Sequence, residues 1–324
     1  MARVALLSNP RSTGNRSLLP RVRSFCAEHK DIFHYEVEHV DQIGKALRTI
    51  DRVKPKVLVI NGGDGTVQAA LTELYHGGHF GSAPPPVAVL PNGKTNLIAM
   101  DLGAEGDPIK ALERVLEMVR SDLEPHIVSR ELIALSDGTA TGKAVLGMFL
   151  GGAGLADTML YCRHKIYPLG LPNGISHVLT VLLAMASIIF GIRGSFFPPS
   201  PTHVKISVLK HGEFQGKFAF LMVTTLQRLL FKGHMPGAEQ RVGSMQLMVI
   251  ERSPWALIQA LVAAVRGRLG RSRLAGVHLG RGEEIRIEGD HSSVILDGEL
   301  FEANVDRPIV LKPTGPVPFL RLAA

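Results

Sequence analysis

A glycine-rich segment with a single acidic residue follows a short apolar run near residue 60. Val57–Ile60 is entirely apolar, and Gly62-Gly63-Asp64-Gly65-Thr66 begins two residues after it. Glycines let backbone N–H groups approach phosphate oxygens closely, and the start of a helix adds a favourable dipole. The Asp64 carboxylate could bind Mg²⁺ on a nucleotide or accept the proton of a hydroxyl group. The residues alone also leave open a simple strand-to-helix turn in which Asp64 is the N-cap.

Two more polar loops that contain glycine follow apolar runs in the same part of the chain. The first extends from Asn9 to Asn15, and the second extends from Pro91 to Asn96. In an open α/β sheet, ligands bind at the carboxyl ends of the strands, where such loops meet. Three loops at one sheet edge therefore favour a phosphate site over three unrelated turns.

The elements that would position these loops alternate between strand and helix over the first 125 residues. The predicted strands are Arg3–Ser8, Phe33–Val40, Val57–Ile60 and Val87–Leu90, and the predicted helices are Ser17–Glu28, Gln42–Val53, Val67–Tyr75, a helix from Asn96, and Pro108–Arg120. This alternation with short connections is typical of a parallel, doubly wound sheet.

From about residue 126 the pattern becomes that of an antiparallel β domain. Ile127–Leu135 and Lys143–Leu150 flank Asp137-Gly138, which is a hairpin signal. Further strands are predicted at His203–Leu209, Phe218–Thr225, Gln246–Ile250, Glu284–Glu288, Ser293–Leu296 and Asn304–Leu311. Two helical insertions, Ile175–Ile192 and Pro254–Gly267, complete a predicted β-sandwich.

The sequence therefore predicts two domains and a tail. A Rossmann-like, doubly wound α/β domain occupies residues 1–125, and a mostly antiparallel β-sandwich domain occupies residues 126–313. The tail, residues 314–324, can return to the first domain.

The composition excludes several classes of protein. The chain has 324 residues, 36 Lys and Arg against 29 Asp and Glu, a formal net charge of +7 and 45% hydrophobic residues, so it is neither disordered nor fibrous. The two cysteines, Cys26 and Cys162, lie far apart, which excludes a disulfide scaffold or a zinc ribbon and fits a reducing compartment. The sequence has no Gly-x-Ser-x-Gly or His-Glu-x-x-His motif that would indicate a hydrolase.

The three loops resemble the motifs of the diacylglycerol kinase catalytic family, which includes sphingosine kinases and bacterial lipid kinases. The matching residues are Asn9-Pro10 with Ser12, Gly62-Gly63-Asp64-Gly65-Thr66, and Pro91-x-Gly93-x-x-Asn96. Leu296-Asp297-Gly298-Glu299 resembles the late Asp-Gly-Glu motif of the family, so the resemblance spans almost the full chain. NAD kinases and phosphofructokinases share the second loop, whereas the third loop and the late motif favour lipid kinases.

The resemblance implies an ATP- and Mg²⁺-dependent lipid kinase with its active site in a cleft between the two domains. The γ-phosphate would pass to a hydroxyl of a diacylglycerol-like or long-chain-base lipid. Glu299 matches the proposed general base, and Asp64 and Asp297 would assist and hold the Mg²⁺ of the nucleotide. The implied nucleotide-binding residues are Asn9, Ser12, Gly62, Gly63, Asp64, Gly65, Thr66, Gly93, Lys94, Thr95 and Asn96. Without the resemblance, Asp297-Gly298-Glu299 is more simply an ordinary β-turn.

The sequence departs from the family's pattern at three places. Lys94 stands where the third loop usually has Thr, and we expect its ammonium group to contact phosphate. Val242 and Gln246 stand where bacterial members have the aspartates of a structural Mg²⁺ site, so we expect that site to be missing. Thr225 stands where the family often has Asn.

Two segments combine an apolar stretch with basic residues and no acidic residue. Thr158–Gly212 includes the apolar run Ile175–Ile192, and Arg252–Gly282 includes Trp255. Basic residues beside an apolar helix suit an anionic membrane surface, so we expect a cytoplasmic protein that associates peripherally with the membrane. The alternatives are inward packing of both helices and, for Ile175–Ile192, a membrane span of minimal length. Few aromatic residues accompany the arginines, so nucleic acid is not an expected partner.

Two other functions stay open at this point. A catalytically degenerate protein of the same fold would bind a nucleotide or a lipid without transferring phosphate. A relative of NAD kinases would phosphorylate a soluble substrate.

Overall fold

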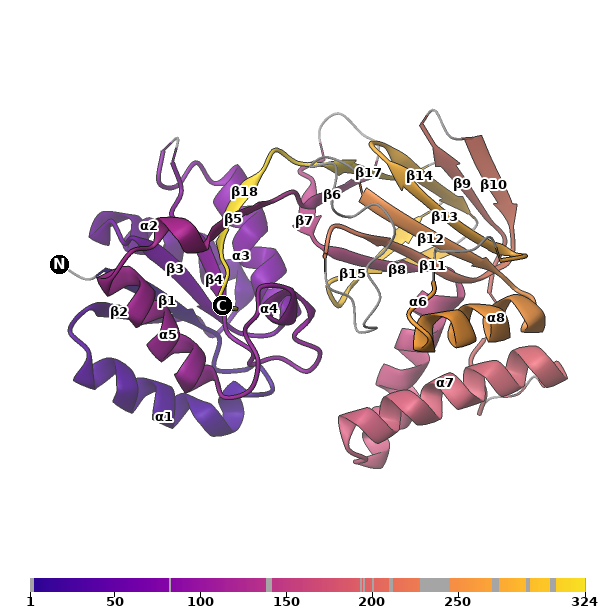
Figure 1. Ribbon diagram of the computed structural model, residues 1–324, viewed down its shortest axis with the longest axis horizontal. Helices are drawn as coiled ribbons and strands as arrows, with labels where there is room; N and C mark the ends of the chain where they lie inside the picture. The colour runs from indigo at the N-terminus through magenta and orange to yellow at the C-terminus, as the bar shows by residue number, and fades with distance from the viewer. Residues whose placement is uncertain are drawn as a thin grey trace. The chain divides into compact units, whose positions relative to one another are not determined.

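The chain forms two compact units in a computed structural model (Figure 1). Unit 1 comprises Met1–Leu132, Val145–Gly147 and Gly315–Ala324, and unit 2 comprises Ile133–Ala144 and Met148–Thr314. The structure describes residues 3–81, 83–137, 142–192, 194, 196–199, 201–209, 212–227, 245–269, 274–289, 292–303 and 307–323.

A mostly parallel sheet forms the centre of unit 1, as the alternating pattern predicts. Its strand order is β2-β1-β3-β4-β18-β5. The strands are β1 (Val4–Ser8), β2 (Ile32–Glu36), β3 (Val57–Asn61), β4 (Val87–Val89), β18 (Val317–Leu320) and the antiparallel β5 (Ile127–Arg130). Every side chain of β1 and β3 is buried, which explains why both strands read as continuous apolar runs.

Helices cover both faces of this sheet. They are α1 (Asn15–Glu28), α2 (Ile43–Val53), α3 (Asp64–His76), α4 (Leu97–Asp101) and α5 (Pro108–Arg120), with 3₁₀ turns at Val40–Gln42 and Glu124–His126. α1 packs against α5, and α2 packs against α3 on the opposite face (Figure 1). The predicted bounds of α5 are confirmed, since the Asp107 carboxylate accepts the Ile109 N–H and Pro108 opens the helix.

The C-terminal segment returns to unit 1. β18 lies between β4 and β5, parallel to β4 and antiparallel to β5. Because β5 pairs with β18, the division between the units falls after Leu132 rather than at residue 125. β7 (Val145–Gly147) also belongs to unit 1, where the Leu146 N–H donates to Thr72 Oγ1 on α3.

Two antiparallel sheets form unit 2. One has the order β10-β9-β14-β17-β6-β7, with β7 at its edge, and the other has the order β13-β12-β11-β8-β15-β16. Their strands are β6 (Ile133–Ser136), β8 (Phe149–Gly152), β9 (Val204–Val208), β10 (Gly212–Gly216), β11 (Phe218–Thr224), β12 (Met245–Glu251), β13 (Val277–Gly282), β14 (Ile285–Gly289), β15 (Ser292–Leu296), β16 (Glu299–Ala303) and β17 (Ile309–Pro313). β9 buries alternate side chains, whereas β12 buries nearly all of them because helices cover one face of the second sheet.

The helices of unit 2 pack on the second sheet and on each other. They are α6 (Gly154–Tyr161), a π-helical turn (Cys162–Ile166), a 3₁₀ turn (Tyr167–Leu169), α7 (Asn173–Phe190) and α8 (Pro254–Val265). α6 packs on β11, α8 packs on β12, and α7 packs against α6 and α8 (Figure 1). Among the described residues, no helix is long and apolar enough to cross a membrane.

The structure corrects three strand predictions. Ile127–Leu135 is not one strand but two, β5 and β6, which join different sheets. Lys143–Leu150 is likewise divided at Met148 into β7 and β8, and Phe33–Val40 ends early because the chain turns at Val40. The turn predicted at Asp137-Gly138 and the start of Asn304–Leu311 lie partly outside the described residues.

Candidate functional site

The loops that follow β1, β3 and β4 meet at one edge of the unit 1 sheet. These three strands are neighbours and run parallel, so their carboxyl ends lie side by side. Asn9 Nδ2 donates to Thr66 Oγ1 over 2.9 Å, which joins the first loop to the second. The convergence expected from the sequence is confirmed.

Three buried asparagines fasten the loops to one another. Asn92 Nδ2 donates to Asn61 Oδ1 over 2.8 Å and also to Asn15 Oδ1. Asn15 Nδ2 in turn donates to the backbone oxygens of Asn9, over 2.7 Å, and Asn61, over 3.0 Å. An amide NH₂ carries two donors, so both hydrogens of Asn92 and of Asn15 are used, while Asn61 Nδ2 donates to Ser8 Oγ over 3.0 Å. Asn15, Asn61 and Asn92 were not among the predicted site residues; Asn61 ends β3, Asn92 lies in the loop after β4, and Asn15 opens α1.

Glycines in these loops are required by the close packing of backbone on backbone. A Cβ added at Gly93 would lie 2.9 Å from the Gly63 Cα, and one added at Gly62 would lie 2.7 Å from the Thr66 Cβ. A Cβ at Gly14 would overlap the Asn92 side chain. The glycines therefore let the three loops touch, in addition to exposing N–H groups.

The second loop ends at the N-terminus of α3. Gly63 is the N-cap in an extended conformation, and its carbonyl accepts the N–H groups of Thr66 and Val67. Glycine has no side chain to cap the helix, so the N–H groups of Asp64 and Gly65 are left for a ligand or water. Such a helix start is suited to an anion, and above all to phosphate.

Asp64 opens this helix and is held from the third loop. Its carboxylate accepts hydrogen bonds from the Thr95 hydroxyl and the Asn96 N–H. Burial outweighs these two bonds and raises the pKa of Asp64 to about 6. A nearby cation would favour the ionised form of Asp64. A metal ion bound to a phosphate group at the start of α3 would be such a cation.

The other predicted nucleotide-binding residues fall into two groups. Ser12 Oγ is buried and, among the described residues, has no hydrogen-bond partner, while Lys94 is exposed. Thr95 and Asn96 instead hold the loops, since Asn96 Oδ1 accepts the Gly93 N–H over 2.6 Å. Asn96 adopts a left-handed conformation with φ of 55°, which asparagine tolerates better than most residues.

The late Asp-Gly-Glu motif forms a tight hairpin turn in unit 2. Asp297 and Gly298 have φ values of 45° and 97° and connect β15 to β16, whose first residue is Glu299. Asp297 is buried, and its carboxylate accepts the N–H groups of Met148, over 2.8 Å, and Phe149, over 3.0 Å. Asp297 thus binds a distant segment of backbone, while Glu299 is exposed.

Comparison with known families decides which proteins this chain resembles. The diacylglycerol kinase catalytic domain matches residues 3–124, the segment that contains all three loops. This segment belongs to the diacylglycerol kinase catalytic family. The resemblance drawn from the loop motifs is therefore confirmed.

Solved structures show that the fold of the family extends beyond this segment. A protein assigned as a diacylglycerol kinase from Bacillus anthracis str. Sterne is 18% identical and covers 96% of this chain and 94% of its own, with a TM-score of 0.63. A diacylglycerol kinase from the same organism is 14% identical, covers 98% and 96%, and gives a TM-score of 0.60. Comparison with curated proteins finds no match. The two-domain α/β and β architecture predicted from the sequence is confirmed.

Unit 2 contains three polar side chains that were not among the predicted site residues. One of them, Thr225, was noted in the sequence only as a departure from the family's pattern. Burial raises the pKa of Asp157, in the first turn of α6, to about 6. Arg163 Nη2 donates to the Gly298 carbonyl over 2.8 Å and so supports the turn that precedes Glu299. Thr225 donates its N–H to the Met148 carbonyl, and its Oγ1 is buried without a hydrogen-bond partner among the described residues.

The described part of the chain shows no preassembled metal centre. Within it, no three His, Cys, Asp or Glu side chains form a group that could hold an ion. Val242 lies outside the described residues, and Gln246 lies on β12, nearly buried. The expected loss of the structural Mg²⁺ site therefore stays a prediction.

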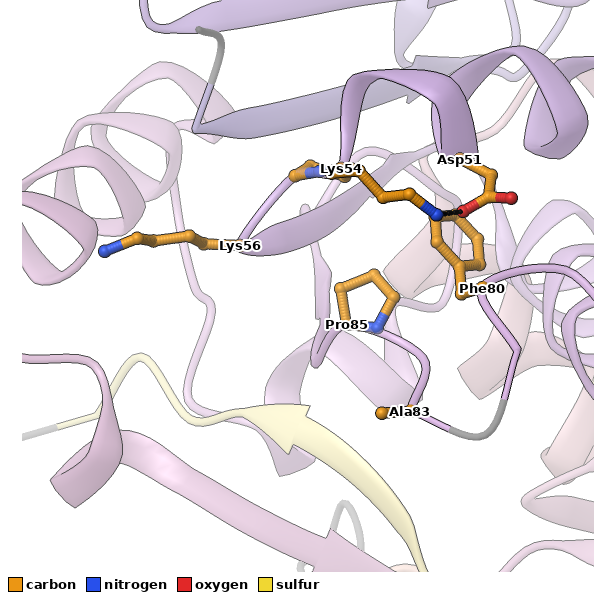
Figure 2. Close-up of a pocket in the computed structure, with 7 residues that line it drawn as sticks. Asp51, Lys54, Lys56, Phe80, Ala83 and Pro85 are labelled. Carbon is orange, nitrogen blue, oxygen red and sulfur yellow. Dashed lines mark hydrogen bonds and ion pairs between the residues drawn. The ribbon is translucent and has the colours of Figure 1, made fainter.

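A shallow hollow in unit 1 lies away from these loops. Lys56 and Pro85, which line it, precede β3 and β4, so the hollow belongs to the opposite edge of the sheet (Figure 2). Figure 2 also shows Lys54 Nζ directed at the Asp51 carboxylate, 2.8 Å away. A hollow at the amino ends of parallel strands is not where ligands of such sheets bind.

Proposed function

We propose that this protein is an ATP- and Mg²⁺-dependent lipid kinase that phosphorylates a hydroxyl of a diacylglycerol-like or long-chain-base lipid. The observation that carries the proposal is the uncapped start of α3, which three interlocked loops surround in a segment of the diacylglycerol kinase family. Phosphate binding is the chemistry that such a helix start supports best.

The loop residues would bind the nucleotide in distinct ways. The N–H groups of Asp64 and Gly65 would donate to phosphate oxygens, and the unpartnered Ser12 hydroxyl would add a further donor. Lys94 is exposed on the third loop and would contribute positive charge. The residues fit a magnesium ion carried by the nucleotide, because Asp64 supplies an anionic oxygen beside these donors. The ion, when bound, neutralises charge on the phosphoryl group that is transferred.

The transfer step needs a base for the lipid hydroxyl. The hydroxyl oxygen forms a bond to the γ-phosphorus, the bond from that phosphorus to the bridging oxygen of ADP breaks, and the proton passes to Glu299. Asp297 would hold the turn through Met148 and Phe149 and would also contact the Mg²⁺ of the nucleotide.

A labelled transfer assay tests this function. Wild-type protein is incubated with γ-labelled ATP and Mg²⁺ in mixed micelles of a total lipid extract, beside Asp64→Asn and the exposed control Asp41→Asn. We expect label in one lipid band with wild type and Asp41→Asn, and loss of at least about 100-fold with Asp64→Asn. A folded, fully active Asp64→Asn variant would refute the assignment.

Two outcomes would replace the proposal with another function. ATP binding in a calorimeter without label in any lipid would indicate a degenerate binding protein. Label in NAD without detergent or lipid would indicate a kinase of a soluble substrate.

A further inference from the structure

The long helix α7 buries three hydroxyl side chains and exposes six large apolar side chains, while Leu179 and Leu183 pack on the cluster of Tyr161, Cys162 and Ile166. Ser176, Thr180 and Ser187 are buried, and their hydroxyls donate to backbone oxygens of Leu171, Ser176 and Ile192. Ile175, Val178, Val181, Leu182, Ile189 and Phe190 are exposed instead, with Val178 at 61% and Leu182 at 59%. A surface helix of a protein surrounded by water has the opposite arrangement.

α8 is inverted in the same sense. The residues that it buries against the second sheet and its surroundings are small, namely Ala256, Ala260, Ala263 and Ala264. Leu257 also packs on this core, whereas the other large apolar side chains of α8 are exposed: Trp255, Ile258, Leu261, Val262 and Val265. Trp255 is 63% exposed and Val265 is 75% exposed, so burial in the protein does not explain their hydrophobicity.

The two inverted helices form one region of unit 2, because α7 packs against α8 (Figure 1). We call their exposed apolar side chains the α7–α8 surface. Contiguous exposed apolar areas of this kind mark interaction sites rather than ordinary surface.

The two segments that carry the α7–α8 surface contain basic residues and no acidic residue. Thr158–Gly212, which contains α7, has no acidic residue, and neither has Arg252–Gly282, which contains α8. Arg163 and Lys165 are exposed before α7, and Arg266 and Arg268 are exposed directly after α8. A positive border around an apolar surface complements a negatively charged, apolar partner.

We propose that the α7–α8 surface docks on the surface of an anionic lipid bilayer, with both helices in the plane of the interface. The apolar side chains would enter the headgroup and upper acyl region, and the basic residues would bind phosphate groups of anionic lipids. Two copies of the chain would bring like charges together at this surface, which disfavours self-association as its purpose. The proposal concerns membrane binding alone, so its test is independent of the test for phosphate transfer.

Trp255 supplies a direct probe, because it is the one tryptophan of the chain and lies on the α7–α8 surface. The full-length protein is mixed with vesicles of phosphatidylcholine alone or with phosphatidylglycerol added. We expect Trp255 emission to shift to shorter wavelength and sedimentation with vesicles only when the anionic lipid is present. High salt should weaken the binding, since part of it is electrostatic.

Matched variants separate docking from unspecific stickiness. Leu182→Asp removes an apolar side chain from the α7–α8 surface, and Leu209→Asp removes one that is equally exposed, at 52%, elsewhere in unit 2. We expect Leu182→Asp to lower vesicle binding by at least about tenfold and Leu209→Asp to leave it unchanged. The double variant Arg266→Gln with Arg268→Gln should reduce binding to anionic vesicles by about tenfold or more, because each basic residue contributes.

Three results would overturn the proposal. The first is no vesicle binding by well-folded wild-type protein, and the second is equal binding by wild type and Leu182→Asp. The third is a dimer of wild type, seen by light scattering in solution, that Leu182→Asp converts to a monomer, because the surface would then belong to a second copy of the chain.

Discussion

The amide side chains of Asn15, Asn61 and Asn92 hold the site loops together without adding charge to them. The Asn15 and Asn61 amides both donate and accept, and the Asn92 amide donates to both of them, so one buried cluster joins three loops. Charged residues in the same places would attract or repel a phosphate group directly. Because this network is neutral, the electrostatic potential of the site depends on the start of α3, Asp64 and Lys94.

The hydrogen bonds of Asp297 predict how a conservative change acts on unit 2. Asp297→Asn replaces one acceptor oxygen by an NH₂ group, so one of the N–H groups of Met148 and Phe149 would face a donor. Asparagine tolerates the left-handed conformation of this turn, so added backbone strain is not expected. We expect a loss of about 1–3 kcal/mol in unfolding free energy, measured by urea denaturation. The exposed control Glu299→Gln should stay within about 0.5 kcal/mol, and equal stability of both variants would contradict the role of Asp297.

The raised pKa of Asp157 predicts a pH-dependent effect on stability. Its pKa rises from 3.8 to about 6 on folding, so the folded chain holds the proton more tightly than the unfolded chain. Stability from this group is therefore present below pH 4 and is lost as pH rises through about 6. Asp157→Asn removes the cost of ionisation, so its urea midpoint should exceed that of wild type at pH 8 and approach it near pH 4. A difference that does not change with pH would show that the pKa of Asp157 is the same in the folded and unfolded chains.

At the scale of elements, the site depends on three strands that end, and on one helix that begins, where their loops can touch. β1, β3 and β4 are adjacent and parallel, so three sequence-distant loops share one edge of the sheet. α3 begins directly at that edge, with Gly63 as the N-cap. The order of the strands, more than any single motif, creates the candidate site.

Two glycines in contact predict effects of different size for the same substitution. A Cβ at Gly93 would lie 2.9 Å from backbone of Gly63, whereas a Cβ at Gly63 would have its nearest atom at 3.8 Å. Gly93→Ala should therefore force the loops apart and lower the unfolding free energy by about 1–3 kcal/mol. Gly63→Ala, measured in the same urea titration, should cost less than about 1 kcal/mol. A Gly93→Ala variant as stable as Gly63→Ala would show that the two loops do not rest on each other.

At the scale of the whole molecule, the two ends of the chain complete the same sheet. β1 lies between β2 and β3, and β18 lies between β4 and β5, so the sheet is incomplete until the C-terminal segment has returned. Phe319 on β18 is fully buried, the largest such side chain in the described part of the molecule.

This arrangement predicts a strong effect of a change near the C-terminus. Phe319→Ala should lower the unfolding free energy of unit 1 by about 3–5 kcal/mol, because it leaves a cavity in the sheet. Phe190→Ala removes the same atoms from a side chain that is 73% exposed and should change stability by less than about 0.5 kcal/mol. Circular dichroism during urea unfolding measures both, and similar values would mean that β18 is dispensable.

The sequence by itself determined the local features of this protein. Continuous apolar runs located β1 and β3, and the predicted bounds of α5 are those of the structure, because each pattern repeats within a few residues. The glycine-rich loops could be interpreted in the same way, since their chemistry follows from residue type. The expected apolar helices at Ile175–Ile192 and Pro254–Gly267 were also found, as α7 and α8.

Only the tertiary structure decided which distant segments meet. It divided Ile127–Leu135 between two sheets, inserted β18 beside β4, and placed the Asp297 carboxylate on the backbone of Met148 and Phe149. It also turned the apolar sides of α7 and α8 outward, which a periodic pattern cannot distinguish from the usual inward packing. The physical reason is that these outcomes depend on contacts between segments far apart in the sequence, such as Met148 and Asp297, which are more than 100 residues apart. The local periodicity of a sequence carries no information about such contacts.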